Sequence, residues 1–420
     1  TMISSATGLP LANASLLDES TAAAEAMTMF YGSTKNHDKN SFFISENCHP
    51  QTIDVLKTRA EPLGIKLIIG NEDSITLDNS IFGMLLQYPA SDGKIVDYTD
   101  LIKKAKQSKI YTCLATDLLA LSILKTPAEM GADAAVGNTQ RFGVPMGYGG
   151  PHAAFFATSE NFKRKIPGRI IGVSKDSHGA KALRMALQTR EQHIRREKAT
   201  SNICTAQVLL AIMSSMYAVY HGPKNIISIA NKVHNQCSKL ATSLNHAGLE
   251  ILHQQFFDTI RIFPIDKWEV EAENEKINFR KFEDGSVGIS LDESTTEEDI
   301  LKICKIFNVS YLSEKSVFSL AEEMKRRTAF LDHEVFNKYH SETEMLRYIH
   351  KLEVKDLSLN NSMIPLGSCT MKLNATTEMI PITWENFCDI HPFSPLEQTK
   401  GYSKLIDELS NWLSVLTGFD

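Results

Sequence analysis

Three stretches of the chain combine residue types that could do chemistry, and the glycine-rich stretch over residues 137–152 is the most unusual. It holds five glycines and two prolines, a density that no regular helix or strand tolerates, so it predicts a tight loop whose backbone closely approaches a neighbouring group. It is not a Walker loop, because no Gly-Lys-Ser/Thr follows, and Pro145 interrupts any dinucleotide fingerprint. A rigid packing loop between sheet and helix is the alternative to a binding loop.

The second stretch is basic. Its cationic residues are Arg184, Arg190, His193, Arg195, Arg196 and Lys198. Glu191 lies four residues before Arg195, the spacing of a helix-stabilising pair. Such runs usually form a solvated helix face, and the functional alternative is a surface for an acidic partner or another subunit.

The third stretch, residues 365–374, is a loop of small residues that includes Ser368, Cys369, Thr370 and Lys372. A lone cysteine can act as a nucleophile, as in an acyl transferase, but it then needs an orienting base. No histidine can be assigned to that task here, so a buried, unreactive cysteine is the stronger interpretation of Cys369. Lys372 either pairs with an anion or is exposed.

Composition excludes several classes of protein. The net charge of −6 over 420 residues argues against a nucleic-acid partner. The seven cysteines are scattered without a CxxC pair, which favours a reducing compartment and argues against a disulfide framework or a zinc site. No apolar run is long enough for a membrane span, and no metal site is expected.

The elements that must position these stretches alternate between strand and helix. Apolar runs at 65–69, 81–88 and 110–115 predict strands, and helical segments at 54–59 and 99–107 separate them. Alternation of this kind predicts a parallel sheet covered by helices on both faces. Ligands of such folds bind beyond the carboxyl ends of the strands.

A short internal echo is also present. Residues 3–8, Ile-Ser-Ser-Ala-Thr-Gly, resemble residues 413–418, Leu-Ser-Val-Leu-Thr-Gly. The second copy ends a predicted amphipathic helix. The match is what a second copy of the fold would give if it began near the end of the chain.

Several strings, in order along the chain, resemble the P-protein family of the glycine cleavage system. They include Gln140-Arg141-Phe142-Gly143-Val144-Pro145, Gly147-Tyr148-Gly149-Gly150-Pro151-His152, Gln188-Thr189-Arg190-Glu191-Gln192-His193, Ser201-Asn202-Ile203-Cys204-Thr205 and the 365–374 loop. The resemblance implies an α/β fold of the pyridoxal 5'-phosphate (PLP)-dependent transferase fold type I. It also implies two homologous halves, of which this chain is most of the first and the start of the second.

The resemblance divides the chain into four parts: a large three-layer α/β/α domain, a smaller α/β domain, a linker, and an arm with the first helix of the second, catalytic half. These parts cover residues 1–205, 206–312, 313–330 and 331–420.

The resemblance further implies that this half is catalytically silent. The family's second half carries its PLP lysine before its own glycine-rich loop, and Arg141 stands at the equivalent position here. A guanidinium stays protonated and cannot form a Schiff base. The aspartate that pairs with the pyridine nitrogen falls at Ala115, or at Asp117 in another register, and two carboxylates, Asp18 and Glu19, stand where a helix N-terminus would receive the phosphate.

For the whole protein, the family implies an oxidoreductase. PLP, bound by the missing half, accepts electrons as glycine loses CO2, and the aminomethyl group passes to the lipoyl group of H-protein; T-protein and L-protein complete the system.

We expect a dimer, cytoplasmic if bacterial and in the mitochondrial matrix if eukaryotic. The residues expected nearest the PLP site are Ser368, Cys369, Thr370, Lys372 and His391. The alternative is a non-catalytic scaffold subunit that pairs with a separate catalytic chain.

Overall fold

The structure is a computed structural model that describes residues 1–34, 39–150, 152–187, 196, 199, 207–314, 316–355 and 375–419. The chain divides into two compact units. The first contains residues 1–144 and 152–348, and the second contains residues 145–151 and 349–420.

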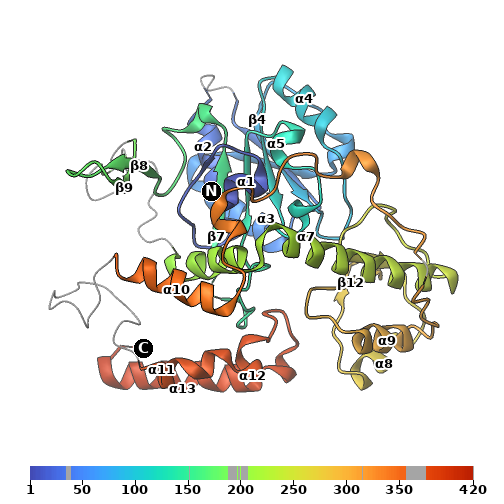
Figure 1. The fold of residues 1–420 in the computed structure, drawn as a ribbon. Coiled ribbons are helices and arrows are strands. Elements are labelled where there is room, and N and C mark those ends of the chain that lie inside the picture. The colour runs from blue at the N-terminus through green and yellow to red at the C-terminus, as the bar shows by residue number, and fades with distance from the viewer. Residues whose placement is uncertain are drawn as a thin grey trace. The chain divides into compact units, whose positions relative to one another are not determined.

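A seven-stranded sheet forms the centre of the first unit (Figure 1). Its strands are β1 (Leu11–Ala12), β2 (Ser41–Ser45), β3 (Lys66–Gly70), β4 (Ile81–Tyr88), β5 (Tyr111–Thr116), β6 (Ala134–Asn138) and β7 (Ala154–Thr158). Their order is β1-β7-β6-β5-β4-β2-β3. Strand β7 runs antiparallel to both of its neighbours, whereas the pairs from β6 to β3 are all parallel. The strands predicted from the apolar runs are therefore confirmed.

Helices cover both faces of this sheet, as a strand buried on both sides requires. Helices α2 (Glu19–Tyr31) and α3 (Pro50–Ala60) pack over one apolar cluster, to which β4 contributes Leu85. Helix α4 (Thr99–Gln107), the short α5 (Pro127–Met130) and part of α7 (Val208–His246) pack over the other, to which β4 contributes Leu86. The expected three-layer α/β/α architecture is confirmed.

A smaller α/β lobe follows the long helix α7. Strands β10 (Thr259–Ile262), β11 (Arg280–Lys281) and β12 (Val287–Ser290) form an antiparallel sheet in the order β10-β12-β11. Helices α8 (Trp268–Asn274) and α9 (Glu297–Ile306) pack against it around a separate apolar core.

Three further elements belong to or border the first unit. Helix α1 (Met2–Thr7) opens the chain, and strands β8 (Ile171–Lys175) and β9 (Lys181–Met185) pair as an isolated hairpin. Helix α10 (Glu342–Glu353) crosses the border between the two units. Residues 313–330, the predicted linker, bury Phe318, Leu320, Met324 and Phe330.

The second unit joins the glycine-rich loop to the C-terminal arm. Its helices are α11 (Thr376–Met379), α12 (Glu385–Cys388) and α13 (Lys400–Thr417). Among the helices that the structure describes in either unit, none is long and apolar enough to cross a membrane.

Candidate functional site

The carboxyl ends of the parallel strands meet at one edge of the large sheet, where ligands of this architecture bind. Asp117 follows β5 at this edge and Arg141 follows β6. The structure brings both side chains together with Asp258, which immediately precedes β10 of the small lobe.

Arg141 is the centre of this cluster. Its Nη1 lies 2.5 Å from Oδ2 of Asp258 and 3.4 Å from Oδ2 of Asp117, and its guanidinium carbon lies 5.9 Å from the centre of the Phe257 ring. Burial on its own would lower the pKa of Arg141, but the carboxylates of Asp117 and Asp258 outweigh it and raise the pKa. The side chain, 17% exposed, is therefore a permanent cation that joins the sheet edge to the small lobe.

The carboxyl group of Asp117 also has its partners within the protein. Burial raises the pKa of Asp117 and the nearby Asp258 adds to that, while Arg141 and the amide of Ala120 favour the charged form. The Ala120 N–H donates to Oδ1 of Asp117 at 2.7 Å. Ala115, the other predicted register for a pyridine partner, is a buried methyl within β5. Neither position offers a free carboxylate to a cofactor.

The N-terminus of α2 is closed by its own side chains. Oδ1 of Asp18 accepts a hydrogen bond from the Thr21 N–H at 2.7 Å, which is an N-cap. Oε2 of Glu19 accepts a hydrogen bond from the amide of Asn138. A phosphate at this helix end would meet two carboxylates in place of free amides.

Residues 145–151 of the glycine-rich stretch belong to the second unit, where the arm binds them. The amides of Gly147 and Tyr148 donate to the carbonyls of Cys388 and Ile390, at 2.7 and 2.9 Å, and the Tyr148 ring stacks on Tyr402 at 4.4 Å. These amides hold protein carbonyls, which favours the packing interpretation of the loop over the binding one.

The remaining predicted site residues are only partly covered by the structure. His391 lies in the arm beside the residues that hold the loop; its Nδ1 accepts from the Phe393 N–H at 3.0 Å, and burial lowers its pKa. Ser368, Cys369, Thr370 and Lys372, together with most of the basic stretch, lie outside the described residues. Their placement near a PLP site stays a prediction.

Sequence reasoning missed two features of this edge. Asp258 carries no motif and lies 117 residues from Arg141, so only the fold reveals the pair. His49, at the N-terminus of α3, is the second: burial lowers its pKa, Glu19 opposes that shift and Arg280 adds to it. His49 lies five residues before the predicted helical segment 54–59, so no local pattern marked it.

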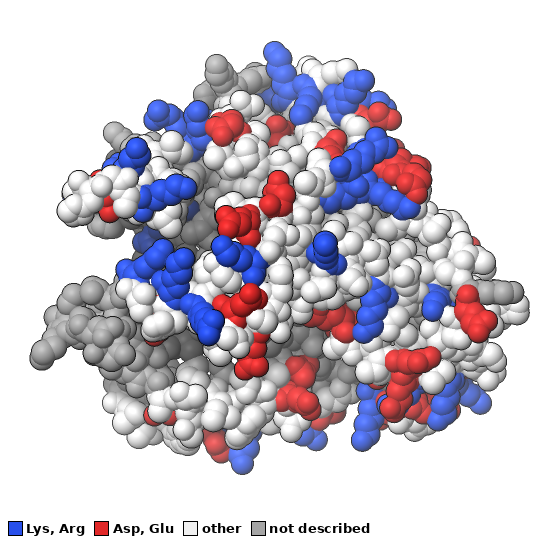
Figure 2. Space-filling view, in the orientation of Figure 1, with Lys and Arg blue, Asp and Glu red and all other residues white. Residues whose placement is uncertain are grey.

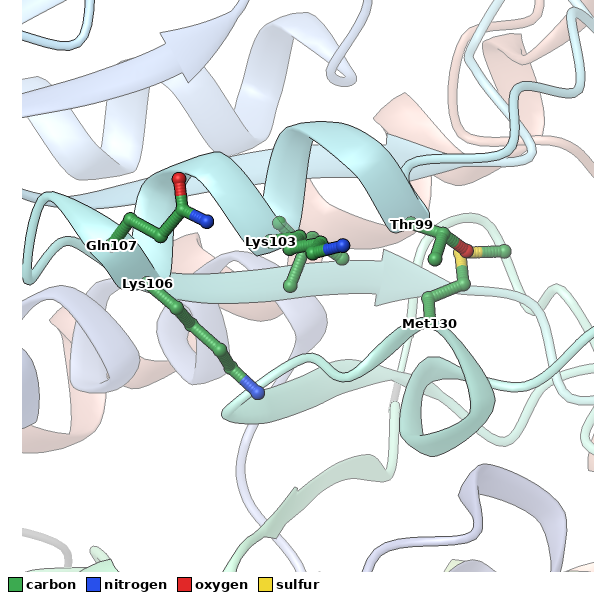
Figure 3. A pocket seen from close by; sticks show the side chains of 6 residues that line it. Thr99, Lys103, Lys106, Gln107 and Met130 are labelled. Carbon is green, nitrogen blue, oxygen red and sulfur yellow. The ribbon is translucent and has the colours of Figure 1, made fainter.

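A pocket elsewhere in the first unit lies along α4. It is lined by Thr99, Ile102, Lys103, Lys106, Gln107 and Met130 (Figure 3). Its ionisable lining groups are two lysines, and it includes none of the residues of the Arg141 cluster.

Comparison with solved structures defines the class of protein. A crystal structure of glycine decarboxylase (P-protein) of the glycine cleavage system matches with a TM-score of 0.67 and 30% identity, over 73% of each chain. A C-DES mutant with glycine covalently linked to PLP shares the fold alone, with a TM-score of 0.53 and 11% identity. The chain therefore has the fold of the PLP-dependent fold type I enzymes.

The chain belongs to the glycine cleavage system P-protein family, whose sequence profile matches residues 1–307. It is 57% identical to a glycine dehydrogenase (decarboxylating) of Nostoc sp. and 54% identical to one of Pelagibacter ubique, in each case over the whole of this chain. It spans 44% of the length of these relatives.

Proposed function

We propose that this chain is the half of a glycine-decarboxylating P-protein that lacks the Schiff-base lysine. In the complete enzyme, PLP bound by the other half supplies the electron sink for decarboxylation of glycine. The aminomethyl group then passes to the lipoyl group of H-protein, and T-protein and L-protein act on the products. The bacterial relatives support a cytoplasmic enzyme, and we propose that it is a dimer.

One observation carries the proposal: the ion pairs of Arg141 with Asp117 and Asp258. These ion pairs occupy the carboxyl ends of the strands, where a cofactor of this fold binds. Arg141 stands in place of a lysine there, and its guanidinium cannot lose its proton.

The residues at this edge do not fit PLP, and no step of the reaction is assigned to them. Two lysines lie in the loops that follow β4 and β5, and each is in an ion pair: Lys94 with Asp73 at 3.3 Å and Lys125 with Asp97 at 2.7 Å. The neighbouring helix end is already capped by Asp18. We infer that this half shapes and completes the active site of the other half, and that the arm with residues 368–372 and His391 lies nearest to it.

A non-catalytic scaffold subunit is the second candidate function. The solved P-protein chain and this chain each cover 73% of the other, so chains of similar length exist in the family. A scaffold subunit would copurify with a second, catalytic polypeptide from its native source, whereas a half of one continuous enzyme would not.

The test of the silent half is cofactor binding by purified residues 1–420. We expect no visible absorbance of a Schiff base after addition of PLP and no exchange of label between CO2 and the carboxyl group of glycine. A P-protein that contains both halves is the positive control. Either signal in a clean preparation of residues 1–420 would overturn the proposal.

A further inference from the structure

The β8–β9 hairpin presents an apolar face to solvent. Its strands pair Ile171 with Met185 and Val173 with Leu183. All four side chains are at least half exposed, with Val173 and Leu183 at 72% and 75%. They lie on one face, because alternate residues of a strand share a face.

Such a hairpin lacks the cover that a two-stranded sheet needs. Two strands alone are marginally stable in water and require a further strand or a packed face. Its opposite face carries Gly172, Ser174, Ala182 and Arg184, and there the Gly172 backbone packs closely against the methyl group of Ala186. Beyond their cross-strand pairing, the four large side chains stay at least half exposed among the residues that the structure describes.

Charge at the tip indicates what the partner surface contains. The third cross-strand pair on the apolar face is Lys175 with Lys181. In Figure 2 the hairpin region shows uncharged surface flanked by Lys and Arg atoms. The acidic residue of the turn, Asp176, is used locally, since it accepts from the amides of His178 and Ala180 at 2.9 Å. The complementary surface is apolar and bordered by carboxylates.

A second copy of the same hairpin does not meet this requirement. A tip-to-tip pair would bring four lysines together. An antiparallel pair would place Lys175 and Lys181 over residues 168–170 and 186–187, which contain Arg169 and no carboxylate. Like charges brought together oppose association.

We propose that the apolar face of the β8–β9 hairpin docks on the part of the P-protein that lies outside this chain, at an apolar surface bordered by carboxylates. The chain spans 44% of the length of its relatives, so the larger part of the family's sequence is available as this partner. The inference rests on the proposed function, because it takes that other part to be the PLP-binding half.

Hydrogen–deuterium exchange tests the docking without a substitution. The amides of residues 171–175 and 181–185 are followed in residues 1–420 alone and in a P-protein in which this chain continues into the other half. We expect at least tenfold slower exchange at the hairpin in the full protein. Equal exchange, in a full protein that is active in glycine–CO2 exchange, would overturn the docking and leave the proposed function standing. An unmodified full protein without that activity would overturn the proposed function and the docking with it.

Matched variants of the full protein locate the contact. Val173→Glu with Leu183→Glu charges the apolar face, and Ser174→Glu with Ala182→Glu charges the opposite face of the same two strands. We expect only the first pair to restore fast hairpin exchange. Equal effects of the two pairs would overturn the assignment of the face.

Discussion

At the scale of the residue, Arg141 supplies a structural function. It donates to carboxylates of two different lobes, so it links the edge of the large sheet to the small lobe through a buried cation. Removing such a cation lowers the stability of the fold mainly because the remaining buried carboxylates have no positive partner, which is costly.

Arg141→Met should therefore lower the free energy of unfolding by about 3 kcal/mol, since Asp117 and Asp258 would face each other uncompensated. Urea denaturation of residues 1–420 measures the change. Adding Asp258→Asn to Arg141→Met should recover part of the loss, because it removes one of the two stranded charges. Additive losses in the double variant would contradict the account of this cluster.

Arg326 is a second cationic side chain that joins distant segments, and its hydrogen-bond partners are backbone carbonyls. Its five N–H groups donate to five backbone carbonyls at 2.6–2.9 Å, those of Ser5, Ala6, Leu121, Thr328 and Ala329. They connect the segment after residue 325 to α1 and to the turn after β5.

Arg326→Ala should lower the free energy of unfolding by about 3 kcal/mol, because the partly buried carbonyls of Ser5, Ala6 and Leu121 lose their donors at about 1 kcal/mol each. Arg326→Lys should recover less than half of this, since an ammonium lacks the planar set of donors. Thermal and urea unfolding provide the measurement. A lysine variant as stable as the native protein would show that charge alone matters here.

At this scale, what could be predicted from the sequence depended on how far apart in the chain the interacting residues lie. The chemistry of Arg141 could be inferred from its type and from the resemblance, because it lies inside a glycine-rich stretch. Asp258 could not, because nothing local marks an acid whose partner lies 117 residues away. Arg326 was equally invisible, since its partners are backbone carbonyls.

At the scale of the element, the predicted bounds of a strand matched the structure where an apolar run and a chain-breaking residue indicated the same end. The run 81–88 is strand β4 with the predicted bounds, because an uninterrupted apolar run ends at Pro89. Alternation alone is a weaker guide: Ile277 and Phe279 alternate with polar residues as in a strand, but β11 covers only Arg280 and Lys281. Phe279 packs against Trp268 and Phe307, so a tertiary contact replaces the regular strand.

The long helix α7 has a break at Gly222, within the sequence His221-Gly222-Pro223. Gly222 has φ 66° and ψ 174°, a region open essentially to glycine alone. A Cβ there would lie 2.5 Å from Cε1 of His340 and 2.7 Å from the Phe336 carbonyl oxygen. The break thus lets α7 accept the segment before α10.

Gly222→Ala should lower the free energy of unfolding by about 3 kcal/mol, the sum of backbone strain and a clash with backbone. Gly248→Ala is the matched control, because Gly248 also has a positive φ, 93°, but a Cβ there would meet nothing within 4 Å. It should cost about 1 kcal/mol. Equal losses in the two variants, measured by urea denaturation, would show that the contact with the 336–340 segment contributes nothing.

At the scale of the whole molecule, the short echo in the sequence corresponds to the same helix ending in both units. In α1, Thr7 Oγ1 donates to the Ile3 carbonyl and the Gly8 amide to that of Ser4. In α13, Thr417 donates to the Leu413 carbonyl and Gly418 to that of Ser414, and both glycines have φ near 75°. Ala6 and Thr7 of α1 are buried, whereas the matching Leu416 of α13 is 80% exposed. The likeness supports α13 as the start of a second copy of the fold.

The pH dependence of folding is a property of the whole molecule, and four of the described histidines act in the same direction. Burial lowers the pKa of His49, His221, His234 and His391. Each is more easily protonated in the unfolded chain, where its pKa is about 6.5. Their contribution to stability is therefore complete above about pH 6.5 and is lost as the pH falls through the folded pKa values.

His234 offers the sharpest test of this dependence, because its Nδ1 lies 2.9 Å from the Phe257 carbonyl oxygen in the buried part of α7. Between pH 7.5 and 5.5 the free energy of unfolding should fall, by at most about 1.4 kcal/mol per pH unit for each histidine. His234→Gln keeps an N–H donor and cannot titrate, so its unfolding free energy should fall less steeply. Urea denaturation at each pH gives the difference between the two proteins, which cancels the carboxylates common to both. Parallel curves would show that His234 is already protonated in the folded protein, or that another group governs acid unfolding.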